Sequence, residues 1–181
     1  MVIKSSDIDL SFIKKVCEVG GESIKKCFQC GTCTASCVMG PYTTFRTRRL
    51  LRRALLGLKD HVLHSDDLWL CAACYTCYDR CPRGVKIPVV ISALRAVAVD
   101  EGVIHPGVRH TKAFLKSVGR NGRINEAAVI LSTIGLNPKG LLDLMKMARA
   151  MAIKGKRPPT KPEPIPDVEQ VQKIYELVVR R

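Results

Sequence analysis

The sequence predicts a mostly α-helical protein with a helical C-terminal extension. Apolar residues recur at intervals of three and four along several segments, which is the spacing of one helix face. No segment shows the polar–apolar alternation that is typical of a strand. Glycine and proline fall between the periodic segments, where helices end and begin. At 181 residues the chain is long enough to bury a core.

The first expected helix covers residues 9–19, with Asp9 as its N-terminal cap and Gly20-Gly21 at its end. Its apolar face predicts that Cys17 is a buried small hydrophobic residue without a further role. The residues of this face are Phe12, Ile13, Val16 and Cys17.

A second helix is expected within residues 40–57, which read GPYTTFRTRRLLRRALLG. Its apolar stripe is formed by Leu51, Ala54, Leu55 and Leu58, at the spacing of one helix face. The opposite face is strongly basic. It carries Arg46, Arg48, Arg49, Arg52 and Arg53.

The second half of the chain also reads as helices. One begins near Pro88 and stops at Gly102, and others are expected over residues 110–120, 124–135 and 138–153. Gly119 and Asn121-Gly122 are expected to separate the first two of these. We expect residues 1–153 to form one helical domain. A proline-rich linker follows at 154–166, and residues 167–181 form a helix that docks on another surface, through Val168, Val171, Ile174 and Val178.

The most informative feature of the sequence is a duplicated cysteine motif. CFQCGTCTASC at residues 27–37 has the spacing C-x2-C-x2-C-x3-C, and CAACYTCYDRC at residues 71–81 repeats it. The second copy is followed by Pro82, whereas the first is followed by Val38. Eight of the nine cysteines belong to these two copies, and the ninth is Cys17.

Eight closely spaced cysteines could form disulfides, bind zinc or bind iron–sulfur clusters. Disulfides are disfavoured, because the N-terminus lacks the apolar region of a secretory signal and we expect a reducing, cytoplasmic location. A zinc site has four ligands, often in two separated pairs, and would leave one thiol of each triplet without a role. The spacing C-x2-C-x2-C-x3-C-P is that of bacterial ferredoxins, which hold [4Fe–4S] clusters. We therefore expect two [4Fe–4S] clusters.

In two-cluster ferredoxins the fourth cysteine of each motif binds the other cluster. The expected ligands of the first cluster are Cys27, Cys30, Cys33 and Cys81. The expected ligands of the second cluster are Cys71, Cys74, Cys77 and Cys37. We expect the rings of Phe28, Trp69, Tyr75 and Tyr78 to pack around the clusters and keep water away from them.

The chain is basic, with 30 Lys and Arg against 16 Asp and Glu and a formal charge of +14. Two clusters bound by four thiolates each would lower this charge to about +10. The arginines of residues 46–53 are either a solvated helix face or a surface for an acidic partner. Nucleic acid is a weaker interpretation, because no nucleic-acid-binding motif accompanies them. No apolar run is long enough for a membrane span.

The two motifs and the helical stretch between them resemble the α-helical ferredoxin module of succinate-dehydrogenase-type iron–sulfur proteins and of heterodisulfide reductases. CFQCGTCTASC together with LWLCAACYTCYDRCPRGVKIP is more specifically similar to the family of C subunits of methanogen CoB–CoM heterodisulfide reductases. The resemblance covers about residues 24–135. It implies an α-helical ferredoxin fold with two [4Fe–4S] clusters.

The resemblance also implies a function. The chain is expected to relay electrons from a flavin-containing iron–sulfur subunit to a catalytic subunit with cysteine-rich CCG domains, which reduces the CoM–CoB heterodisulfide in methanogenesis. A hydrogenase or formate dehydrogenase is an expected member of the larger complex. The chain itself has no Cys-Cys pair and no GxGxxG motif, so no catalytic or flavin site is expected in it.

Two alternatives stay open from the sequence. One is an iron–sulfur relay for another reductase or dehydrogenase, of the quinone-linked, lactate or glycerol-phosphate type. The other is a zinc-stabilised nucleic-acid-binding protein, which would use the same thiols and the same positive charge. Iron, sulfide and zinc analysis separates these two classes, because about eight irons per chain are expected only for two clusters.

Overall fold

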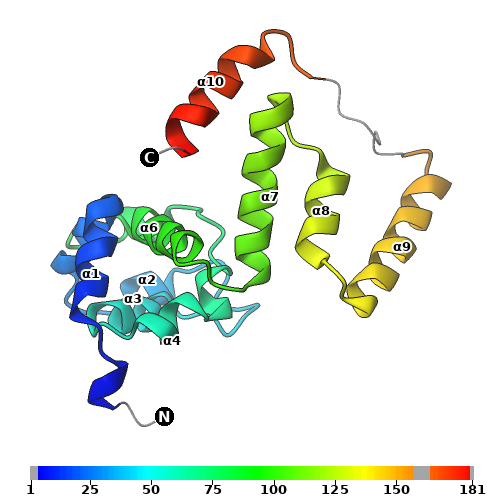
Figure 1. Ribbon diagram of the computed structural model, residues 1–181. Helices are drawn as coiled ribbons and strands as arrows, with labels where there is room; N and C mark the ends of the chain where they lie inside the picture. The colour runs from blue at the N-terminus through cyan, green and yellow to red at the C-terminus, as the bar shows by residue number, and fades with distance from the viewer. Residues whose placement is uncertain (1–3, 157–163, 180–181) are drawn as a thin grey trace. The chain divides into compact units, whose positions relative to one another are not determined.

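The computed structural model describes residues 4–156 and 164–179 of the chain, and the regular elements in these ranges are all helical. This confirms the mostly α fold. The chain divides into two compact units between Val103 and Ile104 (Figure 1). The division expected from the sequence, at 153/154 and 166/167, stays a prediction, and much of the expected linker lies outside the described residues.

The first unit begins with helix α1, Leu10–Val16. The cap is the predicted one: Ser11 N donates a hydrogen bond to Oδ1 of Asp9 over 2.9 Å. The helix is shorter than predicted, because the chain widens at Cys17 into a π-helical turn that Gly20 breaks with φ +96°. Cys17 therefore lies just beyond the buried stripe of α1 and is half-buried, so the prediction that it is buried was wrong.

The predicted basic helix is α3, Thr47–Leu55, and it is followed by α4, Lys59–Leu63. Leu51 and Ala54 of the apolar stripe are fully buried, and Leu58 is buried in the turn between the two helices. That turn depends on Gly57, whose φ is +72° and whose carbonyl accepts a hydrogen bond from Asp9 N over 2.8 Å. The turn thus ties the start of α1 to the end of α3.

Helix α6, Ile87–Asp100, forms the centre of this unit. It starts with Pro88 in its first turn and is followed by Gly102 at φ +67°, as the sequence predicts. It packs against α1, α4 and the turn Cys17–Gly21. Because it is covered on several sides, it is apolar around most of its circumference. Its buried residues are Ile87, Pro88, Val90, Ile91, Ala93, Leu94, Val97 and Ala98.

The second unit contains α7 (Pro106–Asn121), α8 (Glu126–Ile134), α9 (Pro138–Ile153) and α10 (Val168–Val179). Helix α7 begins four residues earlier than predicted, because the His105 ring caps it by accepting a hydrogen bond from Gly107 N and proline suits a first turn. Gly119 was expected between two helices and instead lies inside α7. A Cβ at this position would lie 2.6 Å from Cγ of Tyr175 in α10.

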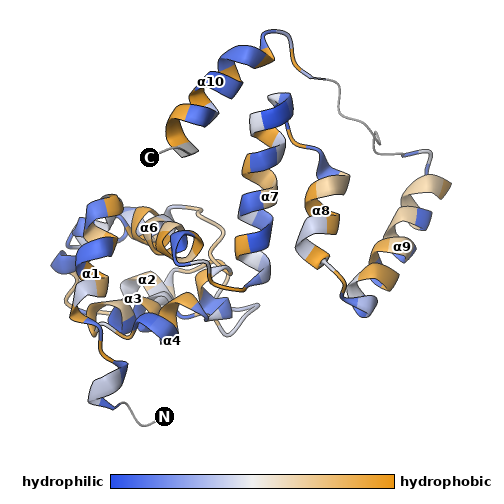
Figure 2. Ribbon diagram, viewed as in Figure 1, coloured by the Kyte–Doolittle hydropathy of each residue, from blue (hydrophilic) through white to orange (hydrophobic). Residues whose placement is uncertain are grey.

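Helix α10 packs on α7 through a face other than the predicted one. The Tyr175 ring lies against Gly119, and Nε2 of Gln172 donates to the carbonyl of Arg120. Of the predicted contact residues, Ile174 and Val178 are instead well exposed. Figure 2 shows apolar and polar residues side by side along α9 and α10, as in amphipathic helices. Docking of residues 167–181 on another protein stays a prediction.

Candidate metal centres

The two cysteine motifs fold into matching loops. The second residue after the first cysteine has a left-handed backbone in both, with φ +66° at Gln29 and +50° at Ala73. The fourth residue after it does so as well, with φ +90° at Gly31 and +63° at Tyr75. A short helix follows each loop: α2, Thr32–Ala35, and α5, Thr76–Asp79. The repeat in the sequence is thus a repeat in the backbone.

Three of these four left-handed residues carry a side chain, namely Gln29, Ala73 and Tyr75. This conformation is unfavourable for residues other than glycine and persists where the surroundings enforce it. Such strain tends to gather at binding sites. The surroundings of these loops, rather than the backbone preference of their residues, therefore determine their conformation.

The first motif surrounds a cavity of about 350 Å³, part of which is open to solvent. Four thiols line it, those of Cys27, Cys30, Cys33 and Cys81. The floor is apolar and consists of Leu51, Val85 and Ile87, which are buried. The remaining lining residues are Phe28, Gln29, Gly31, Thr32, Arg48, Pro82 and Arg83.

The second motif surrounds a similar cavity of about 340 Å³. It is lined by the thiols of Cys71, Cys74, Cys77 and Cys37. Here the apolar wall comes from other elements and consists of Val38, Met39, Phe45, Pro88 and Ile91, beside Thr47 and Ala72.

Each cavity therefore combines three cysteines of one motif with the last cysteine of the other. Cys81 reaches the cavity of the first motif and Cys37 that of the second. The exchange is possible because the short helices α2 and α5 pack against each other. These two groups of four are the ones expected from the sequence. Cys17 lines neither cavity.

The protonation of the thiols follows their burial. Burial raises the pKa of Cys33 and of Cys71, and it raises the pKa of Cys77 to about 12. The hydroxyls of Thr32 and Thr76 lie 3.4 and 3.5 Å from the sulfurs of Cys30 and Cys74 and lower the pKa of these exposed thiols. Since a cysteine binds metal as a thiolate, loading the buried positions must release protons.

Several N–H groups donate hydrogen bonds to cysteine sulfurs. Ala73 N donates to Cys71 over 3.4 Å, and Val85 N donates to Cys81 over 3.3 Å. The side-chain amide of Gln29 donates to Cys27 over 3.4 Å. Such hydrogen bonds stabilise thiolate charge and raise the reduction potential of iron–sulfur clusters.

The donor set fits a cluster better than a single ion. None of the nine cysteines forms a disulfide. Within residues 4–156 and 164–179, no three His, Cys, Asp or Glu residues converge closely enough to hold one metal ion. Zinc would draw four sulfurs to about 4 Å from one another, since each Zn–S bond is about 2.3 Å long. Four thiols spread around a cavity of about 350 Å³ suit a group of several irons.

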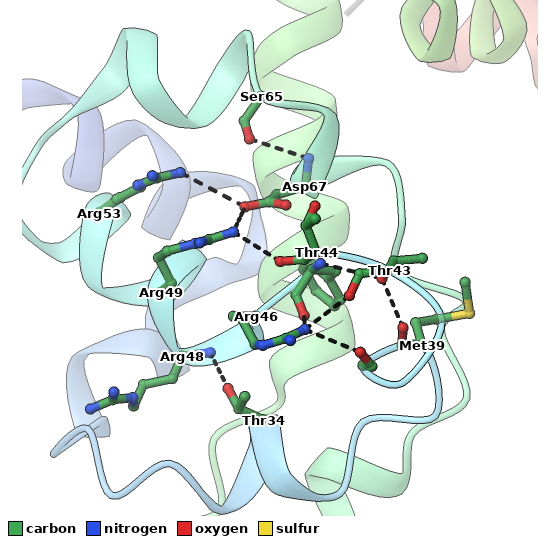
Figure 3. A network of polar contacts seen from close by, with 12 residues as sticks. Thr34, Met39, Thr43, Thr44, Arg46, Arg48, Arg49, Arg53, Ser65 and Asp67 are labelled. Carbon is green, nitrogen blue, oxygen red and sulfur yellow. Dashed lines mark hydrogen bonds and ion pairs between the residues drawn. The ribbon is translucent and has the colours of Figure 1, made fainter. Parts of the chain in front are cut away.

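The arginine-rich face of α3 is largely engaged in holding the first unit together (Figure 3). Arg46 donates through Nη1 to three carbonyls of the preceding loop over 2.8–3.1 Å. Arg49 donates to the carbonyl of Thr44 and to the buried carboxylate of Asp67, which also lies 3.8 Å from Arg53. The solvated-face interpretation is thus incomplete, because these side chains anchor a loop and a buried acid.

One further arginine supports the second cavity. Arg95 of α6 donates to the carbonyls of Leu68 and Cys71 and lies over the ring of Trp69, 5.4 Å from its centroid. It therefore fixes the chain where it enters the second motif. This role is not visible in the sequence, because the arginine is distant from the motif along the chain. The paired threonines after Cys30 and Cys74, by contrast, become visible when the two motifs are aligned.

The aromatic residues near the motifs do not all pack as expected. Phe28 is 60% exposed, Tyr75 49% and Tyr78 36%. Their rings therefore do not form a closed shield, although Phe28 lines the first cavity. That these rings keep water from a cluster stays a prediction.

Comparison with known proteins identifies the region of the two motifs. Residues 23–85 match the family model of a 4Fe–4S dicluster domain. The matched segment contains both cysteine motifs and leaves out Cys17. In the part of the chain that the structure describes, no helix has the length and apolar character needed to cross a bilayer.

Curated relatives cover most of the chain. The iron–sulfur C2 subunit of CoB–CoM heterodisulfide reductase from Methanocaldococcus jannaschii is 45% identical over 147 residues, which are 76% of this chain and 78% of the relative. The chain belongs to the family of heterodisulfide reductase C subunits.

Two further members of the same family support this assignment. The C subunit of the H2:CoB–CoM heterodisulfide,ferredoxin reductase from Methanothermobacter marburgensis is 36% identical over 173 residues, 96% of this chain and 84% of the relative. The C2 subunit of the H2/formate:CoB–CoM heterodisulfide,ferredoxin reductase from Methanococcus maripaludis is 40% identical over 76% of this chain and 79% of its own length. As a family member, the chain is an iron–sulfur component of an oxidoreductase complex.

Proposed function

We propose that this chain holds two [4Fe–4S] clusters and relays electrons from a flavin-containing subunit to the catalytic subunit that reduces the CoM–CoB heterodisulfide. The observation that carries the proposal is the grouping of the thiols. Each cavity is lined by four of them, three from one motif and one from the other. The same grouping is found among the cluster ligands of two-cluster ferredoxins, which supports the proposal.

The proposed ligands are Cys27, Cys30, Cys33 and Cys81 for the first cluster. For the second they are Cys71, Cys74, Cys77 and Cys37. When bound, each cluster supplies a one-electron redox couple. The protein contributes thiolates, a dry apolar floor and N–H donors to sulfur, which together set the potential.

The packing of the first unit suits this task. Part of the lining of each cavity is almost fully buried: Leu51 of the first, and Phe45 and Ile91 of the second, are about 1% exposed or less, so water is excluded from this side. Cys30 and Cys74 are exposed, so each cavity also has one side close to the surface. Proximity to the surface is what transfer to another protein requires.

The assignment of a flavin-containing donor and a CCG-domain acceptor rests on family membership. The relatives named above are C subunits of heterodisulfide reductases, including enzymes named for H2, formate and ferredoxin. A hydrogenase or formate dehydrogenase as part of the larger assembly and a cytoplasmic location belong to the same proposal.

The ligand sets are tested with single cysteine variants of the anaerobically purified chain. The unmodified chain should contain about eight irons and eight sulfides. Cys33→Ser and Cys77→Ser should each abolish a different EPR signal of the reduced protein. Cys37→Ser should abolish the same signal as Cys77→Ser, although it lies in the other motif.

The matched control is Cys17→Ser, which should leave iron content and both signals unchanged. If Cys37→Ser abolished the signal that Cys33→Ser abolishes, the exchange of ligands would be refuted. About two zincs per chain without sulfide would refute the clusters altogether. The relay is tested separately, by measuring electron transfer from the flavin-containing subunit to the catalytic one in the presence and absence of this chain.

A further inference from the structure

The two cavities differ in the charge of the residues around them. Around the first, the lining residues include Arg48, Arg83 and Phe28. Around the second, the corresponding residues are uncharged, among them Val38, Met39 and Ala72. No Asp or Glu lines either cavity. Two loops with the same backbone thus present different chemistry to a partner.

Arg48 is placed at the first cavity by its backbone. Its N–H donates to Oγ1 of Thr34 over 2.9 Å, which joins the first turn of α3 to the short helix after the cysteine loop. Its side chain passes over the loop, because a Cβ on Gly31 would lie 3.7 Å from Cδ of Arg48. In Figure 3 its guanidinium points away from the network that engages Arg46, Arg49 and Arg53.

Arg83 and Phe28 complete this surface. Both are exposed, Phe28 to 60%. Among the described residues, neither Arg48 nor Arg83 takes part in an ion pair. Arginine and aromatic side chains are enriched at protein interfaces, and an arginine is covered at low cost only when an acidic group meets it. The surface therefore favours a partner with carboxylates.

We propose that Phe28, Arg48 and Arg83 form the docking surface for one redox partner, a protein that presents an acidic patch beside its own redox centre. The cluster proposed for the first cavity then exchanges electrons across this surface, and the second cavity serves a partner whose contact depends little on charge. The inference rests on the proposed function. It adds that electrostatic attraction speeds the association of a partner at the first cavity but not at the second.

The test uses the iron-loaded chain with the flavin-containing and catalytic subunits of the same organism, each purified separately. Association rates are measured by surface plasmon resonance between about 20 and 500 mM salt. In the double variant Arg48→Glu/Arg83→Glu, association with one of these two proteins should slow by about tenfold at low salt and lose most of its salt dependence. Association with the other should stay unchanged.

The matched control is Lys14→Glu/Arg52→Glu, which makes the same change in net charge at exposed positions that line neither cavity. This control variant should reduce the association rate with either partner only slightly. Equal effects of the two double variants, or no effect of the first, would overturn the docking surface. Tighter binding of single-stranded RNA than of either protein partner, dependent on Arg48 and Arg83, would also overturn it.

Iron content and EPR signals of each variant are measured alongside. They separate failure of this inference from failure of the proposed function. If the unmodified chain with about eight irons bound neither partner, the proposed relay would fail and the docking surface with it. If it bound both and the arginine variant bound equally well, only the docking surface would fail.

Discussion

The buried carboxylate of Asp67 is expected to hold the arginine-rich helix α3 in place, and Asp67→Asn removes its charge. Oδ2 of Asp67 lies 2.9 Å from Nη2 of Arg49 and 3.8 Å from Nη1 of Arg53. The backbone N–H of Asp67 donates to Oγ of Ser65 and fixes the position of the acid. Asparagine keeps the shape and one acceptor oxygen but loses the attraction to both arginines.

The expected loss of stability follows from the exposure of the partners. Removing one partner of a fully buried ion pair costs about 3–5 kcal/mol, whereas an exposed pair contributes about 0–1 kcal/mol. The Asp67 side chain is 8% exposed, but the side chains of Arg49 and Arg53 are 46% and 23% exposed and can bind water instead. The free energy of unfolding should therefore fall by about 1–2 kcal/mol.

The assay is thermal unfolding of the iron-loaded chain under anaerobic conditions, followed by circular dichroism at one fixed heating rate. For a unit of about 100 residues, this loss corresponds to a decrease of about 5–10 °C in the apparent midpoint. The fixed rate is needed because cluster loss makes unfolding irreversible. Iron content at 25 °C should stay at about eight per chain, since Asp67 lines neither cavity.

The matched control is Asp100→Asn, the same chemical change at an exposed position near the end of α6. A surface substitution of this kind changes stability by about 0.5 kcal/mol or less. If Asp67→Asn lowered the midpoint no more than Asp100→Asn, the carboxylate would not anchor α3. The helix would then be held by its apolar stripe and by the bonds from Arg49 to the loop.

Three further predictions concern other parts of the chain. Gly57→Ala should lower the free energy of unfolding by about 1–3 kcal/mol and should lower the midpoint more than Gly20→Ala does, because both glycines have positive φ but of these two only Gly57 would place a Cβ 2.7 Å from a backbone oxygen. Hydrogen bonds from two lysines hold the pKa of Glu101 below its ordinary value. Its stabilising effect is therefore present at neutral pH and lost in acid, so the midpoint difference between the native chain and Glu101→Gln should disappear as the pH falls through that pKa. Gly119→Ala should speed amide hydrogen exchange in α10 but not in α7, because the new methyl group would meet the Tyr175 ring; unchanged exchange in α10 would contradict the packing.

Local signals predicted the helices of the first unit well. The cap at Asp9, the proline at the start of α6 and the glycine after it are short-range features, and the structure has all three. The structure places the cysteines around two cavities in the groups expected from the duplicated spacing, and their role as cluster ligands stays a prediction. Errors occurred where a residue had a distant partner. Gly119 looked like a helix end, yet it lies within a helix where the Tyr175 ring needs the space.

The roles of the arginines could not be predicted for the same reason. In the sequence, five arginines at residues 46–53 form one basic face. In the structure, Arg46, Arg49 and Arg53 bind acceptors within the first unit, and Arg48 lies at a thiol-lined cavity. Helical periodicity predicts on which face of the helix a side chain lies, but not which groups it meets there. Here the carbonyls of the neighbouring loop and the carboxylate of Asp67 bind three of the arginines.

The proposed exchange of ligands has a consequence for folding. If Cys81 and Cys37 bind across the motifs, neither loop has a complete ligand set until the other is in place, and the chain between them must already be folded. That chain includes α3 and α4, and buried residues of α3 also form part of the cavity walls. The left-handed residues Gln29, Ala73 and Tyr75 add strain that binding of a cluster would help to offset. Binding of the two clusters should therefore be cooperative, and the first unit should gain most of its stability in the step that loads them.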